Sequence, residues 1–148
     1  MIVKNEEKVL KRCLNCVKDI VDEIIIVDTG STDKTKEIAR KYTDKVLDFK
    51  WVNDFSKARN YSFSKATKDY ILWLDADDVI TKENQKKLLQ LKNTLPKNTD
   101  IVMMKYVTSI NPHFSYYRER LLKREKNYKW KSPVHEVIEL NGKLQYTD

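Results

Sequence analysis

Tyr70-Ile-Leu-Trp-Leu-Asp-Ala-Asp-Asp78 is the stretch that decides the fold, because five large apolar residues run without interruption into three carboxylates. An apolar run without polar alternation predicts a strand that is buried on both faces of a parallel sheet. The carboxylates then stand at the C-terminal end of that strand, where open α/β sheets bind ligands. Asp75, Asp77 and Asp78 repel one another unless a cation or protons intervene, and oxygen ligands favour Mg²⁺ or Mn²⁺. The alternative interpretation is a solvated acidic turn that begins a helix, with Asp78 or Thr81 as its N-cap.

The size and composition of the chain fit one globular domain that spans residues 1–148, with 41% apolar and 34% charged residues. The formal net charge of +7 and the pI near 9.3 suit an anionic ligand such as a nucleotide, a nucleic acid or a lipid head group, or serve solubility alone. No apolar run is long enough to cross a bilayer, and no signal peptide opens the sequence. We therefore expect a cytoplasmic protein.

Cys13 and Cys16 form a CxxC pair, which invites a metal or redox interpretation. The sequence has no second cysteine pair, and both histidines lie far along the chain, so a zinc site is incomplete. Leu10, Cys13, Leu14 and Val17 recur at helical spacing, which predicts a buried helix face with structural, reduced cysteines. Reduced thiols fit the cytoplasm.

Hydrophobic periodicity and turn residues predict an alternation of strands and helices along the first two thirds of the chain. Strands are expected at residues 1–3, 22–28, 45–48, 70–74, 100–107 and 134–140, and helices at residues 5–18, 34–41, 53–66 and 82–93. The alternation predicts a doubly wound α/β layer over residues 1–107, with a mostly parallel sheet flanked by helices and a first strand cut short. Residues 108–148 are expected to form a small antiparallel addition, closed by an Asn141-Gly142 turn.

Two of the predicted strands end on carboxylates, at Asp28 and at Asp75. If these strands are neighbours in one parallel sheet, both carboxylates face the same crevice. Asp28 is suited to accept a hydrogen bond from a ring N–H, as in uracil, whereas Asp75 and Asp77 are suited to hold a cation that neutralises a diphosphate. Gly30 stands alone, without a P-loop or a GxGxxG motif, so an NTP-cradling loop and a dinucleotide fold are disfavoured.

Five segments together resemble the signature segments of family 2 glycosyltransferases. They are Ile2-Val-Lys-Asn-Glu-Glu7, Asp22-Glu-Ile-Ile-Ile-Val-Asp-Thr-Gly-Ser-Thr-Asp33, Trp51-Val-Asn-Asp-Phe-Ser-Lys-Ala-Arg-Asn60, Asp69-Tyr-Ile-Leu-Trp-Leu-Asp-Ala-Asp-Asp78 and Pro133-Val-His-Glu136. They occur in the family's order and cover nearly the whole chain. The resemblance implies a GT-A fold, a nucleotide-sugar donor (most often a UDP-sugar), dependence on Mn²⁺ or Mg²⁺, and transfer of a hexosyl or N-acetylhexosaminyl group with inversion.

The resemblance also implies which residues bind the donor. Asp28 resembles the aspartate that recognises the base, and Arg59 resembles a donor-contacting arginine. The first signature segment contributes Val3, Asn5 and Glu6 to the donor site. The alternative interpretation of Asp28 is a residue that only caps a turn. The alternative interpretation of Arg59 is a charge on a solvated helix face.

Asp75-Ala76-Asp77 resembles the DxD motif, in which Asp77 ligates the metal and Asp75 supports the ribose or metal-bound water; Ala76 lies between them in the donor site. His135 resembles the histidine that completes the metal or diphosphate site, although a satisfied histidine in a half-buried strand is an equal alternative. Arg120 and Arg124 are either surface charges or resemble the family's later basic residues, which neutralise donor phosphates; we carry Arg124 as the candidate.

The implied mechanism follows from the charge that develops during sugar transfer. The sugar leaves a diphosphate through an oxocarbenium-like state, and a metal held by Asp77 and His135 stabilises the leaving oxygen. An acceptor hydroxyl attacks from the opposite face and needs a carboxylate base. Glu136 is the candidate catalytic base, and its alternative is an outward-facing strand residue. Residues 108–148 would then complete the acceptor and metal side.

Competing interpretations remain open at this point. A nucleotidyltransferase usually has a glycine-rich basic loop after its first strand, which Lys4-Asn5-Glu6 does not provide. A phospho-acceptor receiver domain expects an acidic pair there, and Glu6-Glu7 is a poor match. A nucleotide-binding domain without activity is the third. The acceptor is open among a glycan, a lipid-linked sugar and a protein; no nucleic-acid partner is expected, and the inner face of a membrane stays open as a location. The aromatic and basic run at residues 113–130 is either an acceptor platform or an ordinary β-layer.

Overall fold

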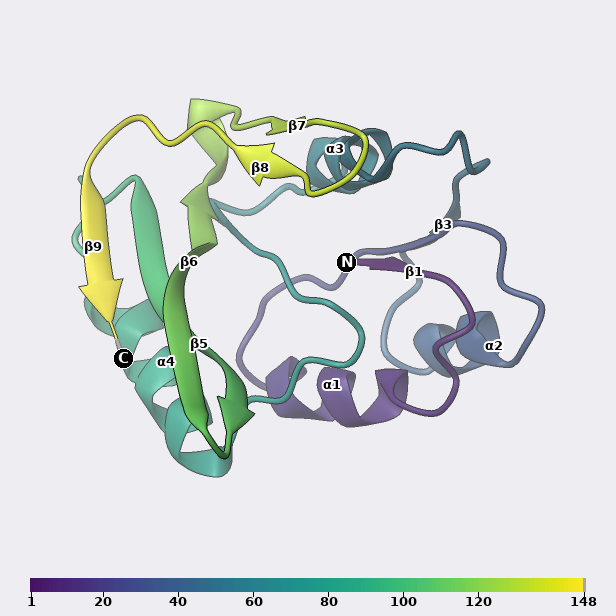
Figure 1. Ribbon diagram of the computed structural model, residues 1–148, viewed down its shortest axis with the longest axis horizontal. Coiled ribbons are helices and arrows are strands. Elements are labelled where there is room, and N and C mark those ends of the chain that lie inside the picture. Colours follow the sequence, from purple (N-terminus) through teal and green to yellow (C-terminus); the bar gives the residue numbers. More distant parts are fainter. Residues whose placement is uncertain (148) are drawn as a thin grey trace.

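The computed structural model describes residues 1–147, apart from the side chains of residues 109 and 110, and the strands of this part form three sheets (Figure 1). The first sheet is parallel and has the order β1-β2-β3; its strands are β1 (Ile2–Val3), β2 (Ile26–Asp28) and β3 (Val46–Asp48). Two crossover helices connect them, namely α1 (Leu10–Val17) and α2 (Thr35–Arg40). A parallel sheet with helical crossovers confirms the predicted α/β class and the short first strand.

The second sheet is mixed and has the order β4-β6-β5-β9. Its strands are β4 (Tyr70–Leu72), β5 (Ile101–Ile110), β6 (His113–Lys123) and β9 (Leu144–Thr147). The small third sheet pairs β7 (Trp130–Lys131) with β8 (Val137–Ile138) in antiparallel orientation, as expected for the last third of the chain. β5 and β6 form a long hairpin that extends beside α4 (Lys82–Thr94) in Figure 1.

The strand expected at residues 70–74 differs from its prediction in length and in partner. It ends at Leu72 and pairs antiparallel with β6, with Ile71 opposite Leu122, rather than parallel with β2. The pairing extends one residue further through the bond from the Trp73 amide to the Arg120 carbonyl, 3.2 Å. A continuous apolar run indicates burial on both faces but does not show whether the strand pairs parallel or antiparallel. The direction of β4 depends on its partner strand, β6.

The chain between β1 and α1 also differs from its prediction. Asn5 is not a helix N-cap: it has a φ of +56°, and the helix begins only at Leu10. The reason lies in the neighbouring turn, because the backbone amides of Asn5 and Glu6 donate to the Ser31 and Thr35 hydroxyls instead of entering a helix. Side chains that bond to backbone amides in this way compete with helix formation.

Two later helices begin at side-chain caps. Asp54 caps α3 (Phe55–Ser64) through the Lys57 amide, and Thr81 caps α4 through the Asn84 amide. Thr81 rather than Asp78 is therefore the cap of the helix after the acidic turn. The strand expected at residues 134–140 shrinks to β8, because His135 has a φ of +54° and breaks the extended backbone. A short 3-10 helix, η1 (Arg124–Lys126), follows β6.

Two apolar clusters position the ends of the strands. One joins α1 to the first sheet through Leu10, Leu14 and Ile26, and it includes Ala76 of the acidic turn. The other packs α3 against the second and third sheets and consists of Phe63, Trp73, Ile101, Met103, Leu122, Tyr128, Trp130 and Ile138. Cys13 is buried on the predicted face of α1, and both cysteines are free thiols. Within the described residues, no helix is long and apolar enough to span a bilayer.

Candidate active site

The turn after β2 is shaped by Asp28. Its carboxylate is buried, and Oδ1 accepts hydrogen bonds from the amides of Gly30 (2.9 Å) and Ser31 (2.8 Å). Gly30 has a φ of +113°, which a residue with a side chain rarely adopts, so the tight turn depends on glycine. Oδ2 of Asp28 is buried without a hydrogen-bond partner among the described residues. The turn-capping interpretation of Asp28 is thus confirmed, and its role in base recognition stays a prediction.

The segment after β1 is tied to this turn. The Asn5 amide donates to Ser31 Oγ (2.9 Å), Asn5 Oδ1 accepts from the Thr32 amide (2.8 Å), and the Glu6 amide donates to Thr35 Oγ1 (2.7 Å). Val3 ends β1 and is buried beneath them. The structure therefore brings the predicted residues Val3, Asn5 and Glu6 to the same sheet edge as Asp28, where the carboxyl ends of β1 and β2 meet.

Carboxylates crowd together at this edge. Burial and the charges of Asp77, Asp33 and Asp75 raise the pKa of Glu6 above its ordinary value. Burial is the largest cause of this shift, and the three negative charges add to it. Ala76 of the acidic turn packs in the same apolar cluster as Val3, so this turn lies next to the end of β1. The side chain of Asp77 is exposed, and its carbonyl accepts from Arg12 of α1 (3.1 Å). The predicted condition for a shared crevice is not met, because β2 and β4 belong to different sheets; the turn after β4 contacts α1 instead.

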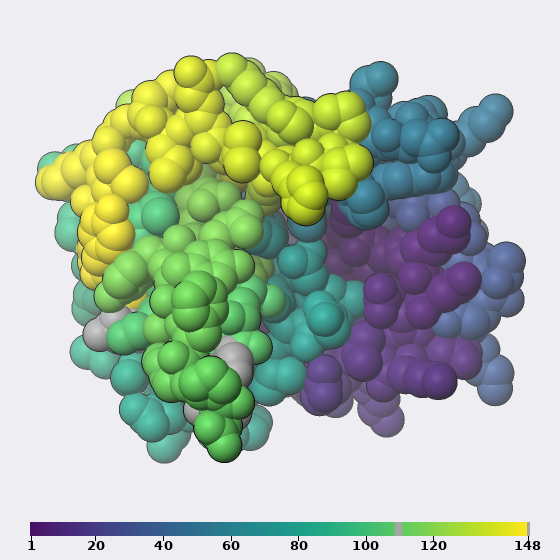
Figure 2. Space-filling view, viewed as in Figure 1, coloured from purple at the N-terminus to yellow at the C-terminus, as the bar shows by residue number. Residues whose placement is uncertain are grey.

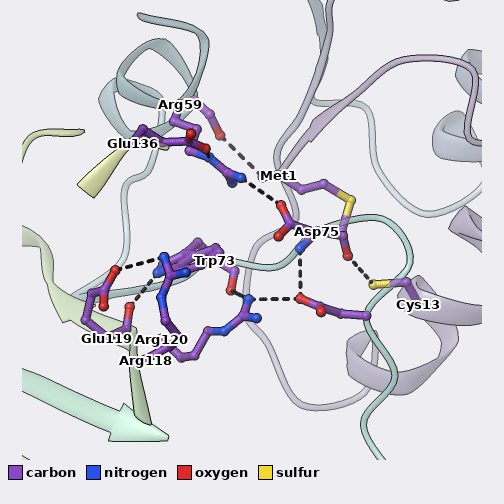
Figure 3. Close-up of polar contacts among 11 residues, drawn as sticks. Met1, Cys13, Arg59, Trp73, Asp75, Arg118, Glu119, Arg120 and Glu136 are labelled. Atoms are coloured by element: carbon purple, nitrogen blue, oxygen red, sulfur yellow. Dashed lines mark hydrogen bonds and ion pairs between the residues drawn. The ribbon is translucent and has the colours of Figure 1, made fainter. Parts of the chain in front are cut away.

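Arg59 of α3 connects the acidic turn to the last predicted segment (Figure 3). Nη2 donates to Asp75 Oδ1 at 2.8 Å, and Nε donates to Glu136 Oε1 at 2.6 Å. The guanidinium also packs over Trp73 and Trp130, 5.1 and 4.9 Å from the ring centroids. Three residues that the sequence nominated separately, Arg59, Asp75 and Glu136, therefore form one chain of contacts. Arg59 is not on a solvated helix face, because its side chain is only 12% exposed.

The loop that carries His135 and Glu136 is held against α3 at two points. The Phe55 amide donates to the Pro133 carbonyl (2.9 Å), and Arg59 pairs with Glu136. His135, next to Glu136 in the chain, is exposed. The alternative interpretation of a half-buried strand histidine therefore does not hold, and metal ligation by His135 stays a prediction.

Two other predicted residues take different places. The Ala76 side chain is buried in the apolar cluster with Leu10 and Ile26, so only its backbone remains for a ligand. Arg124 lies at the opposite end of β4 from Asp75: its Nε donates to the Lys68 carbonyl (2.8 Å) and its amide donates to the Asp69 carbonyl (2.8 Å). The structure thus does not bring Arg124 to the carboxylates, because the chain of β6 turns into η1 there.

A second arginine, Arg120, which the sequence analysis considered with Arg124 but did not carry as the candidate, supports the acidic turn. Arg120 Nη1 donates to Asp78 Oδ2 (2.9 Å), and the same oxygen accepts from the Asp75 amide (2.9 Å). The Arg120 guanidinium lies 4.0 Å from the Trp73 ring centroid, and Figure 3 shows Arg118 on the same ring. The sequence carried two signals for this pair: the third aspartate of the acidic run, and an arginine within the aromatic and basic run.

The residues at this edge fit a hard divalent cation in ligand type and in charge. Carboxylate oxygens are its preferred ligands, and the exposed Asp77 side chain follows the partly exposed Asp75 in the acidic turn. In the part of the chain that the structure describes, no three His, Cys, Asp or Glu side chains are grouped to hold a metal ion. Mg²⁺ is commonly held by one or two carboxylates and by substrate phosphates, so a smaller protein ligand set suffices.

The surface around these residues is hollowed. Figure 2 shows a depression between the N-terminal third, in purple, and the C-terminal segments, in green and yellow, with teal residues on its floor. A different cavity, of about 440 Å³, lies at the opposite ends of β2 and β4, where Ile24, Leu72 and Leu91 are among its lining residues. Its apolar lining does not suit a nucleotide diphosphate, so the depression beside the carboxylates is the candidate active site.

The chain is similar to known glycosyltransferases. It is 37% identical over 139 residues to the SPbeta prophage-derived glycosyltransferase SunS of Bacillus subtilis (strain 168), a match that covers 92% of this chain and 33% of that protein. It is also 37% identical over 140 residues to a TPR repeat-containing protein of Synechococcus elongatus, over 94% of this chain and 34% of that protein. The chain thus spans about a third of the length of these relatives.

Solved structures show the same fold. S. aureus TarS superimposes with a TM-score of 0.58 and 27% identity over 70% of this chain and 33% of that one. Glucosyl-3-phosphoglycerate synthase of M. tuberculosis gives a TM-score of 0.59 at 19% identity over 73% of this chain and 44% of that one, a likeness of fold alone. These neighbours confirm the predicted GT-A fold. Residues 1–141 match the family described as Glycosyl transferase family 2, and the chain belongs to that family.

Proposed function

We propose that the protein transfers a hexosyl or N-acetylhexosaminyl group from a UDP-sugar to an acceptor hydroxyl, with inversion and with Mn²⁺ or Mg²⁺. One observation carries this proposal: Arg59 joins Asp75 of the acidic turn to Glu136, and this turn packs against β1 and β2, whose ends carry Glu6 and Asp28. A relative of the same fold supports the donor, because S. aureus TarS, 26% identical over 70% of this chain, has been solved in complex with UDP.

Each residue has a defined task in this proposal. Asp77 and His135 would hold the cation, which supplies positive charge for the diphosphate leaving group. Asp75 would face the ribose, and Arg59 fixes its carboxylate through the 2.8 Å bond. Asp28 keeps the turn after β2 in place beneath the base.

Glu136 would act as the base. Arg59 occupies its Oε1, which orients Oε2 toward the acceptor, and the side chain is 13% exposed. Glu136 takes the proton of the acceptor hydroxyl while the new bond forms to the anomeric carbon and the bond to the diphosphate breaks. The attack comes from the face opposite the leaving group, which inverts the anomeric centre.

Release of UDP from a panel of hexose and N-acetylhexosamine UDP-sugars tests this function. We expect release by the 148-residue chain with Mn²⁺ or Mg²⁺ and none in EDTA. Asp77→Asn should lower the rate by at least about 10- to 100-fold, because altering a group that only orients a metal ligand already costs about that much.

The matched control is Asp19→Asn, which removes an exposed carboxylate paired with Lys18 and should leave the rate unchanged. Equal release in EDTA would contradict metal dependence. Release of pyrophosphate from nucleoside triphosphates would instead support a nucleotidyltransferase, and binding of UDP without any turnover would support a nucleotide-binding domain.

A further inference from the structure

Asp78 and Arg120 form a buried ion pair directly beneath the acidic turn. Both side chains are only 7% exposed, and Arg120 Nη1 lies 2.9 Å from Asp78 Oδ2. Burying two charges is costly unless the geometry is good and the remaining hydrogen bonds are satisfied. A buried ion pair beneath the acidic turn therefore points to a role, beyond stability, that two apolar side chains could not fill.

The pair grips the backbone of the turn on both sides of Leu74. Asp78 Oδ2 accepts from the Asp75 amide at 2.9 Å, and Arg120 Nη1 donates to the Trp73 carbonyl at 3.3 Å. The Asp78 amide closes the turn by donating to the Asp75 carbonyl at 3.1 Å. These contacts matter because the pairing of β4 with β6 ends at the Trp73 amide, so no strand pairing fixes Leu74 and the turn that follows.

Arg120 is itself immobilised by the aromatic rings on its two sides. Its guanidinium carbon lies 4.0 Å from the Trp73 ring centroid and 4.5 Å from that of Tyr106. A planar guanidinium stacks in this way and still presents its N–H groups at the edge, which an ammonium cannot do. The position of Asp78 is thus set by a rigid partner.

We propose that Asp78 and Arg120 are positioning residues that orient Asp75 and Asp77 toward the nucleotide and its cation. The inference rests on the proposed function. Arg59 fixes the Asp75 side chain from one side, while Asp78 fixes the Asp75 amide from the other (Figure 3). Groups that orient metal ligands without touching the metal typically change metal affinity or activity 10- to 100-fold when they are altered.

Calorimetric titration of UDP in the presence of Mn²⁺ tests the proposal. We expect Asp78→Asn to weaken binding at least tenfold. The matched control is Asp100→Asn, which also removes a buried carboxylate that accepts from a backbone amide, that of Lys143 at 2.9 Å, and pairs with a lysine, Lys126. Asp100 lies beside the opposite end of β4 and should leave UDP affinity within twofold of wild type.

A second variant and a ligand-free measurement keep the outcomes distinct. Arg120→Lys retains the positive charge but loses the planar guanidinium that stacks on the rings, and it should weaken UDP binding severalfold. If Asp78→Asn does not melt cooperatively, and so is not folded, the UDP affinity of Arg120→Lys tests the positioning role instead. In the NMR spectrum without ligand, the Asp75 amide proton should move upfield in Asp78→Asn, since a neutral acceptor forms the weaker bond.

Equal UDP affinity in wild type, Asp78→Asn and Arg120→Lys, each folded, would overturn the positioning role while leaving the proposed function intact. An Asp75 amide proton that does not move would do the same. A wild-type chain that binds no UDP with Mn²⁺ or Mg²⁺ would instead overturn the proposed function, and the positioning role with it.

Discussion

At the scale of single residues, Arg59 shows how one side chain assembles the candidate site. Its fork of N–H donors reaches Asp75 and Glu136 at once, and the rings of Trp73 and Trp130 hold its plane. A lysine carries one compact charge and does not span two carboxylates in this geometry. Glu136 follows Arg59 by 77 residues, so no local pattern in the sequence reveals the contact.

Cys13 provides a test of the buried face of α1. Burial, with the nearby charge of Asp78, raises the pKa of this thiol to about 12, and Sγ donates to the Asp75 carbonyl at 3.4 Å. At pH 8 the group is therefore almost wholly protonated, and only the thiolate is reactive. We expect Ellman's reagent to modify Cys16 in the folded chain more than about 100 times faster than Cys13, and both equally in urea.

The control is Cys16→Ser, which should leave the folded chain without a rapidly reacting thiol. Two thiols that react at similar rates under native conditions would contradict the structural role of Cys13 and favour the redox interpretation of the CxxC pair. Equal rates would mean that the Cys13 thiol is accessible or that its pKa is not raised.

At the scale of elements, Glu23 joins three segments around the start of β2. Its carboxylate pairs with Lys45 before β3 and accepts from the amide (2.9 Å) and hydroxyl (2.7 Å) of Thr67 before β4. Burial alone would raise the pKa of Glu23, but these hydrogen bonds outweigh it and lower the pKa from 4.5 to about 2. A lowered pKa in the folded state stabilises the protein above pH 4.5, and that stabilisation is lost as the pH falls toward 2.

We therefore expect Glu23→Gln to lower the free energy of unfolding at pH 7 by about 2–3 kcal/mol, allowing for screening at the half-exposed Lys45. Urea unfolding at pH 7 and at pH 3 measures the effect, which should shrink at pH 3. Glu37→Gln, which removes an exposed carboxylate paired with Lys41, should change the free energy by no more than about 0.5 kcal/mol. An equal loss for Glu23→Gln at both pH values would refute this account of Glu23.

The elements also show what the sequence could and could not predict. Local chemistry placed the Thr81 cap, the buried face of α1 with Cys13, and the alternation of strands and helices. It failed where distant residues decide the backbone. β4 takes its direction from β6, and the late start of α1 follows from hydroxyls some 26 residues away.

The candidate site divides in the same way. Motif resemblance named Asp75, Arg59 and Glu136 individually, and the structure joins them. It also offered Arg120 and Arg124 together and carried Arg124, which lies at the other end of β4, whereas Arg120 lies beneath the acidic turn. Both arginines belong to the same aromatic and basic run of the sequence, so only the structure separates Arg120 in β6 from Arg124 in η1.

At the scale of the whole molecule, one arrangement supports the function. The acidic turn after β4 lies between the parallel sheet and the loop that carries Glu136, and Arg59 joins this turn to the loop (Figures 1 and 3). The net charge of +7 favours an anionic ligand in general, while the carboxylates of the acidic turn would repel a diphosphate unless a cation came with it. Nucleotide and metal should therefore bind as a pair.

Thermal unfolding with a panel of nucleotides, with and without Mn²⁺, measures this directly. UDP with Mn²⁺ at about 100 times its dissociation constant should add about 2.7 kcal/mol of stability, a rise of roughly 5–10 °C in midpoint temperature for a chain of this size. UDP in EDTA, Mn²⁺ alone, and ADP or CDP with Mn²⁺ should give much smaller shifts. A UDP shift that is equally large in EDTA, or no shift with any nucleotide and metal, would contradict the claim that these carboxylates form one metal-nucleotide site.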